Sequence, residues 1–465
     1  MKLALAAAAL AGLVAAPLPG EDAADLLEKA EARAAAGKYK DAQRLYRKLA
    51  KDHAGTPEAE IGERRGRSSA FLGWADIVRH GDSANRVDVV VMGEGYQIDE
   101  LKAFDKLAED LPDYFRRNRA LGEYYPYFNF LRADLVSADN GVDGFGREYD
   151  TALGGHVIGT YAGHVAVNRD EVREMLEEVP GHDGQAIVFA KLGVLGTGGG
   201  GVATIGGRNM RTAIHEFGHS FGRLSDEYST ETHKRGPVRA NVNVTDSEDP
   251  EEAPWKHWID AKVPGVGMYQ GAAGQARGAW RPTANGCVMA SGEFFCPVCR
   301  EQLVKLIYRR VDPIDGRSPE PHERASAEEL VLGEEPLEFV VQAMRPAKHA
   351  LEATWWVVPE EELPPAKIGA TRAGPYDRRR RRTEGRDPGP LRPIETEPTR
   401  KARGRKDGRH VLTLKRKGLA PGRYRVICRV VDRTMMRGAK HPWVLKDERG
   451  LLQSEVAWWV RVEAD

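Results

Sequence analysis

The residues best suited to chemistry lie in one short segment, His215–Tyr228, which reads HEFGHSFGRLSDEY. His215 and His219 are four residues apart, so a helix would place both imidazoles on one face, within reach of one metal ion. Glu216 lies between them and is suited to polarise a water molecule at that metal. This H-E-x-x-H spacing is the signature of zinc peptidases. We therefore predict one catalytic Zn²⁺ ion held by His215 and His219, with Glu216 as the general base.

The third metal ligand must come from the segment after the helix. Gly222 would let the chain leave the helix and turn back toward the metal, as in the longer metzincin motif H-E-x-x-H-x-x-G-x-x-H. Where that motif has its third histidine, this sequence has Ser225, and serine is a poor zinc ligand. A carboxylate oxygen is a good one. We predict Asp226 as the third ligand, with Glu227 as the alternative.

Two more residues have candidate roles beside the metal. Tyr228 could donate a hydrogen bond to an oxyanion, or it could hold the turn. Met289, in the segment NGCVMASGEFFCPVCR at 285–300, fits the methionine that metzincins carry in a tight turn beneath the metal. An ordinary buried methionine is the alternative for Met289.

The first twenty residues, MKLALAAAALAGLVAAPLPG, are typical of a secretory signal peptide. Lys2 precedes the apolar run Leu3–Val14, and no acidic residue occurs before Glu21. We therefore predict that residues 1–20 are a signal peptide and that the chain is exported, to the periplasm, the cell surface or the medium. An N-terminal buried helix and a retained anchor are the alternatives.

Three of the four cysteines, Cys287, Cys296 and Cys299, crowd around Met289. A C-x-x-C pair is compatible with a redox site or a second zinc site. Because export implies an oxidising compartment, we predict a disulfide from Cys287 to either Cys296 or Cys299. The remaining thiol would pair with Cys428, which could equally be a buried thiol in a strand.

Strand and helix signals alternate over residues 85–312. Apolar runs predict buried strands at Val87–Met92, Phe128–Val136 and Gln185–Leu192. The glycine-rich stretch around Val202–Ile205 is expected to form a sheet edge or a flexible loop. This alternation predicts an α/β class, a mixed-sheet zincin or metzincin-like catalytic domain.

The flanking segments differ from this pattern. Residues 21–84 predict a helical prefix that resembles one tetratricopeptide hairpin, which either packs on the next domain or belongs to a peptide-binding array. Residues 313–329 read as a linker, and 330–465 as a C-terminal β-sandwich. A basic insertion at about 367–409 is expected to be a solvated disordered loop, with a polyanion contact as the alternative.

The composition limits the partners. Lys plus Arg and Asp plus Glu each number 69, so attraction of the whole protein to nucleic acid is not expected. After residue 20 no apolar run is long enough to span a bilayer. The expected partner is a protein or peptide substrate, with no nucleic acid and no membrane span, and the oligomeric state is open.

Several separated blocks resemble one family. HEFGHSFGRLSDEY, VVVMGEGYQIDELKAF, SADNGVDG, APWKHWI and FCPVCRE are similar to the IgA-peptidase-like zinc metallopeptidases, a metzincin-related group, over about residues 87–310. The resemblance implies a secreted or periplasmic endopeptidase with one zinc, bound through His215 and His219, and with Glu216 as catalytic base. It does not imply immunoglobulin as the substrate. The rival interpretation is a surface binding or adhesion protein with a merely structural metal, against which an intact Glu216 argues.

Overall fold

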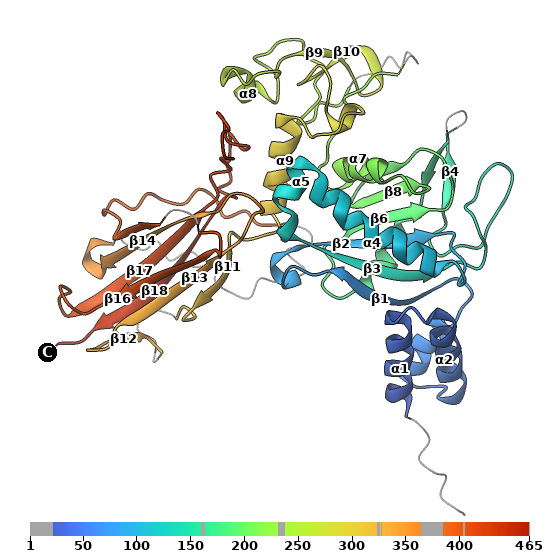
Figure 1. Cartoon of the computed structure of the whole chain (residues 1–465), viewed down its shortest axis with the longest axis horizontal. Helices are drawn as coiled ribbons and strands as arrows, with labels where there is room; N and C mark the ends of the chain where they lie inside the picture. Colours follow the sequence, from blue (N-terminus) through green and yellow to red (C-terminus); the bar gives the residue numbers. More distant parts are fainter. Residues whose placement is uncertain are drawn as a thin grey trace, which may run out of the picture.

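The computed structural model describes residues 22–159, 163–230, 238–322, 326, 328–363, 385–402 and 405–464. N-terminal helices, a mixed central sheet with its helices, and C-terminal β-sheets follow one another along the chain (Figure 1). The predicted α/β class with several sheets is confirmed. The predicted signal peptide lies outside the described residues. Across the described ranges, no helix is both long and apolar enough to cross a membrane.

The central sheet has six strands in the order β1-β3-β2-β6-β8-β7. The inner strands β3, β2, β6 and β8 run parallel, whereas β1 and β7 are antiparallel to their neighbours. Because parallel strands covered on both faces are apolar throughout, three of them were recognisable as continuous runs. The bounds are β1 Ala70–Val78, β2 Val87–Glu94, β3 Phe128–Val136, β6 Gln185–Ala190, β7 Thr197–Gly199 and β8 Val202–Gly206.

Helices cover both faces of this sheet. On one face α4 (Leu101–Arg117) meets α7 (Met210–Ser220), and the rings of Phe115 and Phe217 lie 4.9 Å apart. On the other face α6 (Arg169–Glu177) buries its apolar side against β2, β3 and β6. The remaining elements of the region are α5 Arg119–Glu123, β4 His156–Ile158, β5 His164–Ala166, α8 Lys256–Asp260, β9 Tyr269–Ala272, β10 Gln275–Arg281 and α9 Pro297–Tyr308.

The N-terminal helices α1 (Ala23–Ala35), α2 (Tyr39–Asp52) and α3 (Pro57–Arg65) pack against β1. The Tyr46 hydroxyl, for example, donates a 2.6 Å hydrogen bond to the Leu72 carbonyl. The helical prefix predicted for 21–84 is wrong in its last part, because β1 is already a strand of the central sheet. The pairing of β1 with β3 is non-local and is interrupted by register shifts, so the sequence of β1 shows no regular alternation from which a strand could be predicted.

The C-terminal strands form two sheets, β11-β13-β16 and β12-β18-β17-β14-β15. Phe339 of the first sheet lies 5.1 Å from Trp458 of the second, ring centroid to ring centroid, and Trp355 stacks on Trp458 from the same sheet. Large buried aromatic rings therefore join the two sheets. The bounds are β11 Ile314–Ser318, β12 Leu330–Leu332, β13 Leu337–Ala343, β14 Glu352–Pro359, β15 Arg400–Ala402, β16 Arg409–Leu414, β17 Gly422–Val431 and β18 Gln453–Val462.

Two boundary predictions need correction in this part of the chain. Residues 313–329 are not only a linker, because Ile314–Ser318 pairs with β13 as β11. The described part of the 367–409 insertion is mostly exposed chain without regular structure, as expected of a solvated loop, but two points of it are attached to the fold. Arg400–Ala402 adds a strand to β14, and the buried Arg386 guanidinium donates to the carbonyl oxygens of Tyr308 and Val311 at 2.9 Å. A buried arginine of this kind fixes the insertion to helix α9, which charge counting does not show.

Candidate metal centre and active site

Helix α7 carries both histidines of the H-E-x-x-H motif. The helix begins after Asn209, whose side chain accepts hydrogen bonds from the backbone N–H groups of Arg211 and Thr212. His215 and His219, one turn apart, bring their Nε2 atoms to 3.1 Å from each other. The local spacing in the sequence therefore produces the expected pair of imidazoles.

Backbone carbonyls hold each imidazole by its other nitrogen. His215 Nδ1 lies 3.0 Å from the Val288 carbonyl oxygen, and His219 Nδ1 lies 2.7 Å from that of Leu224. When Nδ1–H donates to these oxygens, each Nε2 presents a lone pair toward the other, which is the tautomer that a metal needs.

The carboxylate of Asp226 completes this group. Its Oδ1 lies 3.2 Å from the Nε2 atoms of both His215 and His219. Burial favours a higher pKa for Asp226, but the two histidines outweigh it and hold that pKa well below its usual range. The three predicted ligand residues thus lie together, and their assignment to a metal stays a prediction.

The chain turns back toward the histidines at a different residue from the one expected. Arg223, with φ +54°, is the left-handed residue, and the Leu224 N–H closes the helix end on the Gly218 carbonyl at 3.1 Å. Gly222 instead allows the backbone to pass close to the end of the helix, since a Cβ there would meet the Gly218 carbonyl oxygen at 2.5 Å.

The alternative ligand, Glu227, points elsewhere. It is fully buried, and its Oε1 lies 2.8 Å from Cys299 Sγ and 3.0 Å from Asn243 Nδ2. Consecutive residues of an extended segment point to opposite sides, so only one of the two carboxylates can face the histidines. In this structure that carboxylate belongs to Asp226.

Glu216 faces the glycine-rich strand β7. A Cβ at Gly196 would lie 2.9 Å from Glu216 Oε1, and one at Gly198 would lie 2.9 Å from Oε2. These glycines therefore leave the space that the carboxylate fills, and they are not a flexible loop. Burial raises the pKa of Glu216, while the neighbouring histidines lower it. A carboxylate whose pKa is raised is better suited to accept a proton near neutral pH.

Met289 lies under helix α7. It is fully buried in a 3₁₀ turn, Val288–Ala290, and a Cβ at Gly218 would meet its Sδ at 2.5 Å. The Met289 carbonyl accepts the Glu227 N–H at 2.7 Å, which ties this turn to the segment that bears Asp226. The tight turn beneath the histidines therefore has the position expected for it.

An open cleft of about 450 Å³ exposes these groups. Tyr228 stands at its rim, and burial together with the nearby Asp226 raises its pKa to about 12, so its hydroxyl keeps a proton to donate. Other lining residues come from β7, from the two residues before it and from the turn after Met289. They include Leu195, Gly196, Thr197, Gly198, Ser291 and Gly292.

Sequence reasoning missed the asparagines that support the ligand segment. Asn243 is fully buried, accepts the Ser225 N–H at 2.9 Å and donates to the Ser225 carbonyl at 2.8 Å. Asn241 donates to the Arg223 carbonyl at 2.6 Å. The only signal was an asparagine pair in NVNV, which by itself does not indicate a partner fifteen or more residues away.

The predicted disulfides are wrong. All four cysteines are free and buried, and the sulfur atoms of Cys287 and Cys299 lie 3.9 Å apart, whereas a disulfide needs about 2.05 Å. Cys428 is a buried thiol in β17, the alternative reading of VICRV.

The comparison with known families agrees with the resemblance. Residues 75–265 match the family model of IgA peptidase M64. The matched segment holds the histidine pair, Glu216 and Asp226, and it ends before the Met289 turn. No curated protein matches the chain. Over residues 75–265, which are less than half of its length, the chain is therefore similar to the IgA-peptidase-like metallopeptidases of the M64 family.

Proposed function

We propose that this protein is an exported zinc-dependent endopeptidase that hydrolyses peptide bonds in proteins. His215, His219 and Asp226 would hold one zinc ion, and Glu216 would act as general base. The observation that carries the proposal is the convergence of two Nε2 atoms and one carboxylate oxygen, at 3.1 and 3.2 Å, beside a buried glutamate in an open cleft.

The three ligand atoms fit zinc. With ligand distances of roughly 2.0–2.1 Å, a tetrahedral zinc site places its ligand atoms about 3.3 Å apart. The three distances found here are close to that value. Two imidazole lone pairs and a carboxylate at such distances repel one another unless a proton or a metal ion lies among them. Three protein ligands also leave the fourth position open, as in catalytic zinc sites.

The residues around the metal have separate roles. When bound, zinc supplies Lewis-acid chemistry, polarising the scissile carbonyl and acidifying water. Glu216 takes the proton from the attacking water and delivers it to the leaving amine. Tyr228 donates a hydrogen bond to the oxygen that becomes negatively charged. The carbonyls of Val288 and Leu224 keep both imidazoles in the required tautomer.

The substrate would lie along β7. This strand is last in the sheet order, and Leu195–Gly198 line the cleft beside Glu216. The sequence placed the sheet edge at Val202–Ile205, but those residues form the inner strand β8. An extended peptide can add to an exposed edge through main-chain hydrogen bonds, while side-chain pockets set its specificity.

We extend the proposal to the domains of the chain. The sheet and helices of residues 85–312, with β1 added, would form a metzincin-like catalytic domain, and the two C-terminal sheets a β-sandwich module. Residues 1–20 would direct export as a signal peptide.

Proteolysis by the full chain tests the proposal. Purified protein should cleave casein or gelatin, lose activity to a chelator and regain it when zinc is restored. The rival, a surface binding protein with a structural metal, predicts no cleavage at any zinc concentration. Mapping cut sites in a peptide library would then define specificity.

A further inference from the structure

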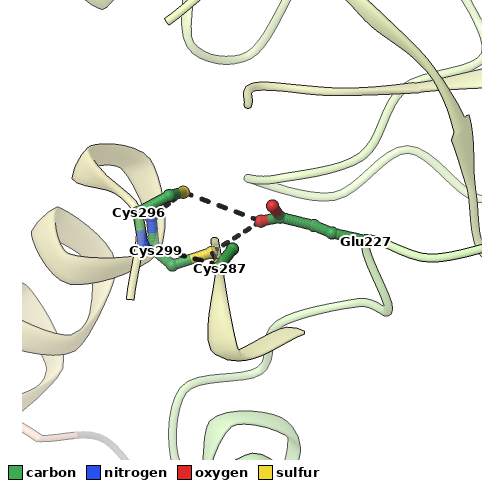
Figure 2. Close-up of side chains that lie close together, drawn as sticks. All are labelled: Glu227, Cys287, Cys296 and Cys299. Carbon is green, nitrogen blue, oxygen red and sulfur yellow. Dashed lines mark hydrogen bonds between the residues drawn. The ribbon is translucent and has the colours of Figure 1, made fainter. Parts of the chain in front are cut away.

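We propose that Glu227, Cys287, Cys296 and Cys299 form a second metal site, which binds a structural zinc ion. Figure 2 shows the four side chains converging from three segments: the chain after α7, the Met289 turn and the start of α9. The cluster shares no ligand with the His215, His219 and Asp226 group, and most of it lies beyond residues 75–265.

The distances suit a metal and not a sulfur–sulfur bond. One ligand atom from each residue lies within 4.8 Å of all the others. The Cys287 and Cys299 sulfurs are 3.9 Å apart, and Glu227 Oε1 lies 3.7 Å from Cys296 Sγ. For Zn–S bonds of roughly 2.3 Å, a tetrahedral site spaces its sulfurs about 3.8 Å apart. A tetrahedral ion therefore fits among these atoms with small adjustments.

The burial of the group calls for a cation. All four residues are buried, and Glu227 is 0% exposed. Glu227 Oε2 is buried and has no hydrogen-bond partner among the described residues. A carboxylate with an unsatisfied oxygen, closed in with three thiols, is costly to bury unless it is paired or coordinates a metal.

Backbone N–H groups also point at two of the sulfur atoms, which favours the thiolate form that binds metals. The Cys296 N–H points at Cys287 Sγ at 3.4 Å, and the Cys299 N–H points at Cys296 Sγ at 3.5 Å. Cys296 is the N-cap of the twelve-residue helix α9, whose positive end stabilises negatively charged sulfur. Three soft thiolates and one carboxylate oxygen would leave no open position, which is the mark of a closed, structural type of zinc site.

The second site is connected to the first through short backbone links. The Glu227 N–H donates to the Met289 carbonyl at 2.7 Å, and the next carbonyl back, that of Val288, holds His215. Cys287 begins this same turn. A metal at the cysteine cluster would therefore fix both the turn that orients His215 and the residue that follows Asp226.

Cobalt substitution of the full chain tests the site without relying on a variant. Protein purified under reducing conditions and loaded with Co²⁺ should show a near-ultraviolet sulfur-to-cobalt charge-transfer band, because of the two candidate ligand groups among the described residues only the cysteine cluster contains thiols. The band should persist in Asp226→Ala, which removes a ligand of the other site. Absence of the band in the cobalt-loaded wild type would overturn the proposal.

Zinc counting provides the second measurement. The wild type should bind about two zinc ions per chain, and Cys299→Ser about one, with Cys428→Ser as the control that keeps two. Equal stoichiometry in all three proteins, or a disulfide within the cluster in non-reducing peptide maps of freshly purified protein, would contradict the proposal. A missing thiolate band with intact proteolysis refutes only the second site. A thiolate band without proteolysis refutes only the proposed function.

Discussion

Asp226 and Glu227 are adjacent in the chain, yet their carboxylates belong to two different ligand clusters. Asp226 Oδ1 is 3.2 Å from His219 Nε2, whereas Glu227 Oε1 is 2.8 Å from Cys299 Sγ. One short extended segment therefore supplies a ligand candidate to each cluster, and a single peptide unit joins the two residues.

Because the two carboxylates lie in different clusters, their substitutions should affect zinc binding at the histidine site to different extents. Asp226→Ala should raise the zinc concentration needed for half-maximal activity far more than Glu227→Gln. Loss of a supporting partner alone costs about 10–100-fold in metal affinity, so loss of a ligand should cost at least that. Activity titrated against buffered free zinc measures the effect. The reverse order would make Glu227 the ligand of the histidine site.

Glu216→Ala should keep the metal and abolish hydrolysis, because the carboxylate acts on water and not as a ligand. Loss of general-base catalysis costs about 10²–10⁴-fold in kcat. Turnover on a fluorogenic peptide, together with zinc analysis of the same sample, checks both parts. A zinc-loaded variant with near-normal kcat would remove Glu216 from the mechanism.

Gly198→Ala should impair catalysis by displacing Glu216. The new Cβ would lie 2.5 Å from the Glu216 carbonyl oxygen and 2.9 Å from its Oε2. A misplacement of about 1 Å can cost about 10²-fold in rate. Gly193→Ala is the matched control, since a Cβ there meets nothing within 4 Å. If both variants have wild-type kcat, the glycine strand does not position Glu216.

Tyr228→Phe separates the two roles open to this residue. As an oxyanion donor it should lower kcat by about 10²–10³-fold without changing zinc content. Tyr114→Phe, a change at an exposed tyrosine of α4, is the control. Unchanged kcat with a lower melting temperature would show that Tyr228 only holds the turn.

His349 should make stability depend on pH at the junction between the central and C-terminal sheets. Its Nδ1 lies 2.8 Å from Glu123 Oε1, and its Nε2 lies 2.8 Å from Asp432 Oδ1. The other oxygen of the Asp432 carboxylate accepts hydrogen bonds from the hydroxyls of Tyr124 and Tyr308. Burial lowers the pKa of His349, but the two carboxylates outweigh it and raise the pKa to about 9.

A raised pKa in the folded state means that protonated His349 favours folding. Its contribution, up to about 3 kcal/mol, is fully present below pH 6.5 and is lost as the pH rises through about 9. Urea unfolding of wild type and His349→Gln between pH 6 and 10 should show that the difference in their free energies of unfolding decreases as the pH rises. A difference that is constant over this range would contradict the prediction.

The sequence by itself determined the local parts of this protein. Two histidines four residues apart lie on one helix face whatever surrounds them, because helical geometry decides it. The strands at Val87–Met92 and Phe128–Val136 were recognisable because burial on both faces requires an apolar side chain at nearly every position.

Only the tertiary structure decided what depends on distant partners. The edge strand β1 exists through its pairing with β3, and its irregular register left no pattern to read. The orientation of Glu227 depends on Asn243 and on cysteines about seventy residues away. The motif spacing pointed to Asp226 with Glu227 as the alternative, but the orientation of each carboxylate, and which thiols meet, follows from packing across the fold.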